Sequence, residues 1–173
     1  MHFIETTKKS LAFLFLCPIF FGISTIAQEK DMILKSWKKT SACKISFLIP
    51  KSVKNLDAKE IDSCVAEFEN KTIRISIDYG WYGSNFTKID TMLEFNEETI
   101  EIDGKKAQLV SYIDGSIFAK QHPKEKYVMG IYVNLSEGQT QEIMKTSLKM
   151  KVAAKSKKEM QTAKQIFHSI KFQ

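Results

Sequence analysis

The chain has 173 residues and a formal net charge of +6 at pH 7, a length that corresponds to one ordinary domain. Arg74 is the single arginine, so lysine carries almost all of the positive charge. Sites for nucleic acid and phosphate favour the planar fork of arginine. The composition therefore predicts a solvated lysine surface and no nucleic-acid partner, and leaves open a weak attraction to anionic lipid or cell-wall polymer.

The N-terminus has the three-part layout of a secretory signal peptide. Two lysines precede an apolar run over residues 11–23, and a polar stretch follows with Ala27 at the −1 position of a cleavage site. The apolar run has at most 16 residues, fewer than the roughly 20 that span a bilayer. We therefore expect residues 1–27 to be a signal peptide cleaved near Ala27, and the protein to be secreted or periplasmic with no transmembrane span after cleavage. An uncleaved anchor and a lipoprotein modified at Cys17 are the alternatives.

The first elements of the exported chain are expected to be a lead-in and one strand. Residues 28–42 are polar and lysine-rich, which predicts a loose or short helical lead-in. From Cys43 to Pro50, apolar side chains occupy every second position, which predicts a strand with one buried face. Cys43 falls on that buried face.

Residues 63–80 are predicted to form a hairpin whose two-residue turn lies at 70–71. This register places Phe68 opposite Ile73 on one face, and Glu67 opposite Arg74 on the other. Apolar residues then pair with each other and opposite charges pair with each other, as cross-strand energetics favour. A slip of one residue would separate the apolar side chains onto different faces, so we expect the register to be well specified.

The two cysteines that remain after cleavage, Cys43 and Cys64, both fall on inward-facing positions of these strands. Removing residues 1–27 takes away two lysines and one glutamate, leaving 24 basic and 19 acidic residues and a net charge of +5. In an oxidising compartment such a cysteine pair usually forms a disulfide. We expect a Cys43–Cys64 bond, with two buried thiols as the alternative.

A second hairpin is predicted over residues 98–113, because Asp103-Gly104 is a favoured type I′ turn. Its register pairs Ile100 with Ala107 and turns Leu109 toward the core. Alternation then predicts a long strand over residues 127–135, in which Gly130 marks a bulge or a close contact.

The last third of the chain is expected to close the domain with a strand and a helix. Residues 136–146 are ambiguous between loop and helix, and residues 147–154 alternate as a strand does, although a helix tolerates the same letters. Ser156 and Glu159 form a capping box, and an apolar stripe over residues 160–170 predicts an amphipathic helix. The expected fold is a single α+β domain over residues 43–173, an antiparallel β-sheet of six to seven strands flanked by helix, with a C-terminal amphipathic helix.

This order of elements resembles the PsbP-like domains, which are photosystem-associated and other exported α/β proteins. The resemblance rests on the ISFLIP strand at 45–50, the IDGKKAQLV hairpin at 102–110, and the closing segment AKQIFHSIKF at 163–172. It implies a central antiparallel sheet flanked by helices and a tendency toward non-enzymatic docking on larger assemblies. It implies no functional residues, and the chain also looks like many small bacterial envelope proteins.

Motifs for metal, nucleotide or nucleophilic chemistry are missing from the sequence. His122 and His168 are far apart, and no HxxxH, CxxC or acidic calcium-loop spacing occurs. No GxSxG and no glycine-rich phosphate loop is present either. We therefore expect no metal site and no cofactor, and regard His168 as a helix-end surface residue and His122 as a solvated loop residue.

The most unusual local feature is the segment DYGWYGSNF at residues 78–86, where a strand ends in aromatic side chains punctuated by glycines. Exposed Trp and Tyr side chains are typical anchors for a protein partner or a sugar ring. We therefore take Asp78, Trp81, Tyr82 and Phe86 as the candidate binding residues. In the alternative, the segment folds back over the sheet and its rings serve as core.

The function predicted from these patterns is that of an exported, non-enzymatic binding or accessory domain of the cell envelope. Its partner would be an envelope protein or a polysaccharide, and its oligomeric state is left open. The rival is a small envelope hydrolase that uses Asp62 with Asp78, or His122, because paired carboxylates can cleave glycosidic bonds. An exposed Trp81 favours the first hypothesis, and a pocket around the acids or His122 favours the second.

Overall fold

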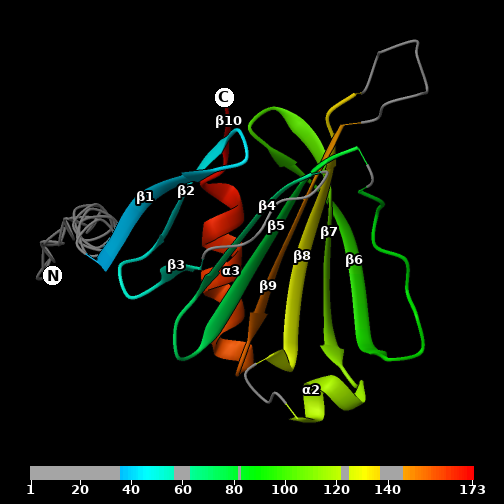
Figure 1. Ribbon diagram of the computed structural model, residues 1–173. Coiled ribbons are helices and arrows are strands. Elements are labelled where there is room, and N and C mark those ends of the chain that lie inside the picture. The colour runs from blue at the N-terminus through cyan, green and yellow to red at the C-terminus, as the bar shows by residue number, and fades with distance from the viewer. Residues whose placement is uncertain (1–35, 57–62, 82, 122–124, 137–145) are drawn as a thin grey trace, which may run out of the picture. The chain divides into compact units, whose positions relative to one another are not determined.

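The structure, a computed structural model, is mostly antiparallel β-sheet with few helices (Figure 1). All of the described residues belong to the second of two compact units, Ser36–Gln173, and are 36–56, 63–81, 83–121, 125–136 and 146–173. The predicted signal peptide and most of the ambiguous segment 136–146 lie outside these described residues. Within them, the sheet-rich architecture expected from the sequence is confirmed.

The larger sheet has seven strands in the order β3-β4-β5-β9-β8-β7-β6, and neighbouring strands run antiparallel. These strands are β3 Lys54–Leu56, β4 Cys64–Glu69, β5 Ile73–Gly80, β6 Met92–Ile102, β7 Lys105–Asp114, β8 Tyr127–Asn134 and β9 Ser147–Ala154. The smaller sheet has the order β1-β2-β10, with β1 Trp37–Ala42, β2 Ile45–Pro50 and β10 Lys171–Phe172. The helices are α2 Ile117–Gln121 and α3 Met160–His168, the latter preceded by a 3-10 turn, Lys157–Glu159.

The small sheet corrects the prediction for the start of the domain. Residues 37–42, expected to be part of a loose or helical lead-in, form β1 and pair with β2. Cys43 and Lys44 have φ of 51° and 61°, so they form the two-residue turn between these strands, and β2 begins at Ile45 instead of Cys43. The pattern missed this turn because neither residue is one that commonly adopts a positive φ.

The first predicted hairpin forms with the expected faces but with its register shifted by two residues. Phe68 is opposite Ile75, not Ile73. The reason is the side chain of Asn70, whose Oδ1 accepts hydrogen bonds from the backbone N–H of Thr72 and of Ile73, each at 2.9 Å. Asn70 therefore begins the turn instead of lying in its centre, a common use of asparagine in turns.

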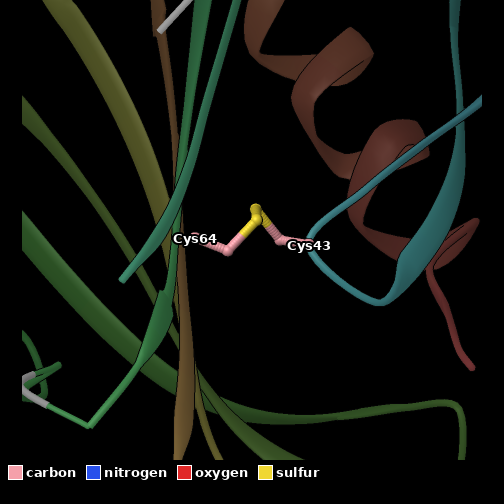
Figure 2. Close-up of a disulfide and its surroundings, with 2 residues drawn as sticks. All are labelled: Cys43 and Cys64. Atoms are coloured by element: carbon pink, nitrogen blue, oxygen red, sulfur yellow. A yellow bond between two sulfur atoms is a disulfide. The ribbon is translucent and has the colours of Figure 1, made fainter. Parts of the chain in front are cut away.

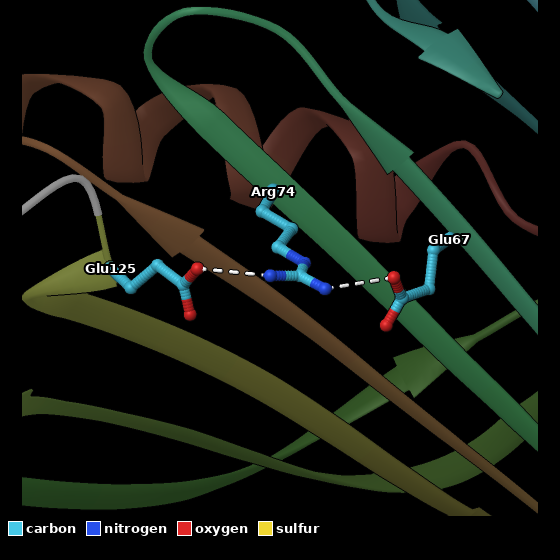
Figure 3. Close-up of polar contacts among 3 residues, drawn as sticks. All are labelled: Glu67, Arg74 and Glu125. Atoms are coloured by element: carbon cyan, nitrogen blue, oxygen red, sulfur yellow. Dashed lines mark hydrogen bonds and ion pairs between the residues drawn. The ribbon is translucent and has the colours of Figure 1, made fainter. Parts of the chain in front are cut away.

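The single arginine joins three segments on the face of the sheet opposite to α3. Arg74 on β5 bonds Glu67 on β4 at 2.9 Å and Glu125, just before β8, at 3.1 Å (Figure 3). The Glu67 hydrogen bond, followed by that of Glu125, raises the pKa of Arg74. The predicted attraction between Glu67 and Arg74 is therefore present, although the register places Glu69 directly opposite Arg74.

The second hairpin and the later strands form as predicted. Asp103 and Gly104 have φ of 49° and 78°, as a type I′ turn requires, and Ile100 pairs with Ala107. Leu109 is buried, and alternate residues of β8 and β9 point into the core. At Gly130 the predicted close contact is present, since the ring of Phe86 lies against its α-carbon.

Helix α3 packs on the core face of the large sheet and contacts β2, β8 and β9. The predicted apolar stripe is confirmed, because Ala163, Ile166 and Phe167 are buried. The capping box is also present, with the Glu159 carboxylate accepting bonds from the backbone N–H and the hydroxyl of Ser156, each at 2.9 Å. The core thus lies between α3 and β2 on one side and the large sheet on the other.

The end of the chain is tied back to this core. β10 pairs with β2, and the Asp103 carboxylate accepts bonds from the Phe172 backbone N–H at 3.0 Å and from Lys171 Nζ at 2.7 Å. The Lys171 bond, followed by that of Phe172, lowers the pKa of Asp103. The turn of the second hairpin therefore helps to anchor the last strand.

The expected disulfide joins Cys43, in the β1–β2 turn, to Cys64, at the start of β4, with the Cα atoms 5.4 Å apart (Figure 2). The alternative of two buried thiols is wrong. The bond connects the two sheets and closes a loop with a sequence separation of 21. A cross-link of this length stabilises mainly by restricting the unfolded chain.

Replacing both cysteines with alanine (C43A/C64A) should lower the free energy of unfolding by about 3 kcal/mol, the loop-closure contribution for a loop of this size. Urea denaturation measures the change, and the reduced wild-type protein should behave as the double variant does. Intact mass after alkylation provides the check, because two alkylated thiols in the unreduced protein would contradict the bond.

Candidate functional site

The aromatic loop, defined as residues 80–86, begins at the end of β5 and is fixed to the start of β9. Ser147 is fully buried, and its Oγ lies 3.4 Å from the carbonyl oxygen of Gly80 and 3.3 Å from that of Gly83. A side chain at Gly83 would collide with this hydroxyl. The absence of a side chain at Gly83 therefore allows the loop to pass close to the sheet.

The other end of the aromatic loop is held by Gln108 on β7. The side-chain amide of Gln108 accepts a bond from the Phe86 backbone N–H at 2.8 Å and donates one to the Phe86 carbonyl at 2.9 Å. The same Nε2 donates to Glu97 on β6 at 2.7 Å. Gln108 thus pairs with the loop backbone as a neighbouring strand would.

Phe86 does not project from the loop. Its side chain is 6% exposed, lies against Gly130 of β8, and has the ammonium of Lys149 4.5 Å from the ring centroid. A cation over the ring face adds an electrostatic attraction to this packing. Phe86 therefore covers the sheet, as the alternative sequence interpretation proposed for the rings of this segment.

Trp81 is different, because 53% of its surface is exposed. It follows Gly80 directly, at a point where a side chain on Gly80 would collide with Ser63. An indole held outside the core between two backbone attachments is a preformed contact surface. Tyr82, the neighbouring aromatic residue that the sequence also proposed for binding, lies outside the described residues.

Asp78, the predicted polar partner of these rings, lies on β5 with Lys149 of β9 directly opposite. Both side chains share the face of the sheet that the aromatic loop crosses, and Asp78 is half-buried. Burial, followed by the charge of Lys151, lowers the pKa of Lys149, and Asp78 opposes this shift. The structure thus adds Lys149 and Gln108 to the residues that the sequence predicted here.

A second aromatic pair lies across the same face, near the sheet edge. The rings of Phe95 on β6 and Tyr112 on β7 stack with centroids 6.4 Å apart and an interplanar angle of 28°. Burial, followed by the charge of Asp114, raises the pKa of Tyr112 to about 12. The phenol is therefore uncharged at physiological pH and is poorly suited to act as a base.

Among the described residues, no set of the side chains proposed for hydrolysis comes together in one site. Asp62 and His122 lie outside the described residues, and Asp78 lies beside Lys149. His168, the last residue of α3, is exposed, as a helix-end residue was expected to be. In the part of the chain that the structure describes, no group of three or more His, Cys, Asp and Glu side chains is placed to hold a metal ion.

Comparisons with known proteins found no family model that matches the chain and no curated protein that is significantly similar to it. Among the described helices, none is long and apolar enough to cross a bilayer. The candidate site therefore rests on its own geometry, an exposed tryptophan on a loop that is fixed at both ends.

Gly130→Ala should destabilise the protein by about 1–3 kcal/mol, because the added methyl group would occupy the space of the Phe86 ring. Urea denaturation measures this cost. Combining it with Phe86→Ala removes the obstructing ring, so the double variant should lose less stability than the two single variants together. Strictly additive losses would show that the two residues do not interact.

The stability of the fold should also decline in alkali. A tyrosine in the unfolded chain has a pKa near 10, below the value of about 12 for Tyr112 in the folded chain. The neutral phenol therefore stabilises the fold fully below about pH 10, and this contribution is lost as the pH rises toward 12. Absorbance at 295 nm should show an ionisation step near pH 12 that Tyr112→Phe removes. A wild-type titration identical to that of the variant would contradict the shift.

Proposed function

We propose that this protein is an exported, non-enzymatic binding or accessory domain that docks onto an envelope protein or polysaccharide through Trp81. The observation that carries the proposal is the 53% exposure of Trp81 on the aromatic loop. Tryptophan is the side chain most enriched among residues that dominate binding energy. The exposed part of this ring leaves apolar surface in contact with water, and a partner that covers it gains the free energy of removing that surface from water.

The attachment of the loop supports the same proposal. Ser147 holds its beginning and Gln108 holds Phe86 at its end, so the loop backbone is attached to the sheet on both sides of Trp81 before a partner arrives. A contact surface that is already ordered loses less conformational entropy on binding. Asp78 and Lys149, on the same side of the sheet, offer a hydrogen-bond acceptor and a donor for sugar hydroxyls or for polar groups of a protein.

Export to an oxidising compartment is supported by the Cys43–Cys64 disulfide and by the signal-peptide pattern of residues 1–27. The finer fold assignment that we propose is α+β and PsbP-like, with α3 on one face of the large sheet. Such a fold fits docking on a larger assembly without catalysis or a cofactor. The rival hydrolase has no comparable observation in its favour, since Asp78 is the only one of its proposed residues that the structure describes.

The test is affinity capture from the native envelope with the tagged protein, run beside Trp81→Ala. If Trp81 is the anchor, the variant should bind the captured partner at least about 30-fold more weakly, the loss typical of a binding hot spot. A separate binding assay with purified cell-wall polysaccharide distinguishes a polysaccharide partner from a protein partner.

Ile117→Ala is the matched control, because Ile117 is also a large exposed apolar side chain but lies on α2, away from the aromatic loop. It should retain the partner, and both variants should show wild-type thermal unfolding. Equal capture by Trp81→Ala and the wild type would refute docking through this site. If the wild-type protein captures no partner, the binding function itself is refuted.

A further inference from the structure

A hollow lies on the core face of the large sheet, beside the first turn of α3. It has a volume of about 240 Å³, and its lining includes Ile113, Tyr127, Met129, Met160, Glu94 and Lys157. Tyr127 and Met129 belong to the core face of β8, whereas Gly130 supports the aromatic loop on the other face. This hollow is therefore independent of the proposed docking site.

The hollow exists because two elements leave space at the same point. The stripe of α3 fills the middle of the core with Ile166 and Phe167, whereas at the start of the helix Met160 packs against the core and is partly exposed. On the other side, the pairing of β6 with β7 is interrupted between Leu93 and Asn96, where Glu94 has a φ of 51°. Bulges of this kind often redirect side chains at functional sites.

The walls and the rim of the hollow differ in chemistry. Met129 and Met160 supply flexible, polarisable side chains that adapt to apolar ligands, and Ile113 adds further apolar surface. At the rim, Lys157 Nζ lies 2.9 Å from a carboxylate oxygen of Glu94, and these side chains are 69% and 62% exposed. An ion pair this exposed contributes little stability, so a competing carboxylate can displace Glu94 at little cost.

We propose that this hollow binds a medium-chain fatty-acid anion, with the alkyl chain between Met129 and Met160 and the carboxylate paired with Lys157. The volume limits the ligand, because pockets for drug-sized molecules start at roughly 300 Å³. A short alkyl chain therefore fits better than a long acyl chain or a fused ring system. Lys157 provides the complementary charge, and its position at the rim leaves the ligand carboxylate in contact with water.

The first test is calorimetric titration of the purified full-length protein, disulfide intact, with butanoate, hexanoate, octanoate and decanoate. Each methylene that enters the hollow should raise the affinity about fourfold, until the chain exceeds the space and the gain stops. Octanoate should bind at one saturable site. No saturable binding in the series, or an affinity that keeps rising through longer chains as in non-specific adsorption, would overturn the proposal.

Variants then locate the site. Lys157→Gln should weaken octanoate binding about two- to fivefold, the loss expected of an exposed ion pair, and leave binding of the uncharged octanol unchanged. Lys158→Gln is the matched control, since Lys158 is an exposed lysine next to it outside the lining. Met160→Trp should abolish binding by filling the hollow.

A direct measurement keeps the test informative if Met160→Trp fails to fold. With ¹³C-methyl labelling of methionine, octanoate should shift the signals of Met129 and Met160 in the wild-type protein and in Trp81→Ala alike. Shifts confined to other methionines, or equal losses of affinity in Lys157→Gln and Lys158→Gln, would show that octanoate binds elsewhere.

Discussion

The structure depends on covering both faces of one seven-stranded antiparallel sheet. The core face presents isoleucines of β5 and alternate apolar residues of β8 and β9, which water would solvate unfavourably. Helix α3 and strand β2 cover this face, and Phe167 and Phe47 are among its largest buried side chains. The opposite face is covered locally by Phe86 on Gly130, next to Val110, which is fully buried. Both proposed sites lie where this cover ends, one at the exposed Trp81 and the other beside the first turn of α3.

Charge has two separate roles around this sheet. Along β6, three exposed pairs link acidic groups to lysines of the closing segment, namely Glu94 with Lys157, Glu98 with Lys164, and Asp103 on the adjoining turn with Lys171. Pairs this exposed contribute little to stability, because water and salt screen them. Because β6 is the edge strand of the sheet among the described strands, its charged side chains and its bulge also discourage edge-to-edge association. The half-buried Arg74 instead connects β4, β5 and the approach to β8.

Local patterns predicted most of the fold correctly. The Asp103-Gly104 turn, the alternation in β8 and β9, and the capping box of Ser156 and Glu159 are short-range signals, because the residues that decide them are within a few positions of each other. The disulfide was predicted from the expected oxidising compartment and from the inward-facing positions of Cys43 and Cys64. The wrong predictions also concern local turns, but there the residue types by themselves do not decide the outcome. The Cys43-Lys44 turn has no turn-forming residue to announce it, and the register of the first hairpin depends on which bonds the Asn70 side chain makes.

For the candidate site, the sequence by itself determined that an aromatic segment punctuated by glycines follows β5, and that it stands near Asp78. Only the tertiary structure decided which ring is covered. Phe86 is buried because Gly130, 44 positions later in the chain, leaves room for its ring, and because Gln108 of another strand holds its backbone. Trp81, five positions before Phe86, stays exposed. Composition and spacing act over a few residues, whereas the burial of a side chain depends on the volume and hydrogen bonds that distant strands bring to it.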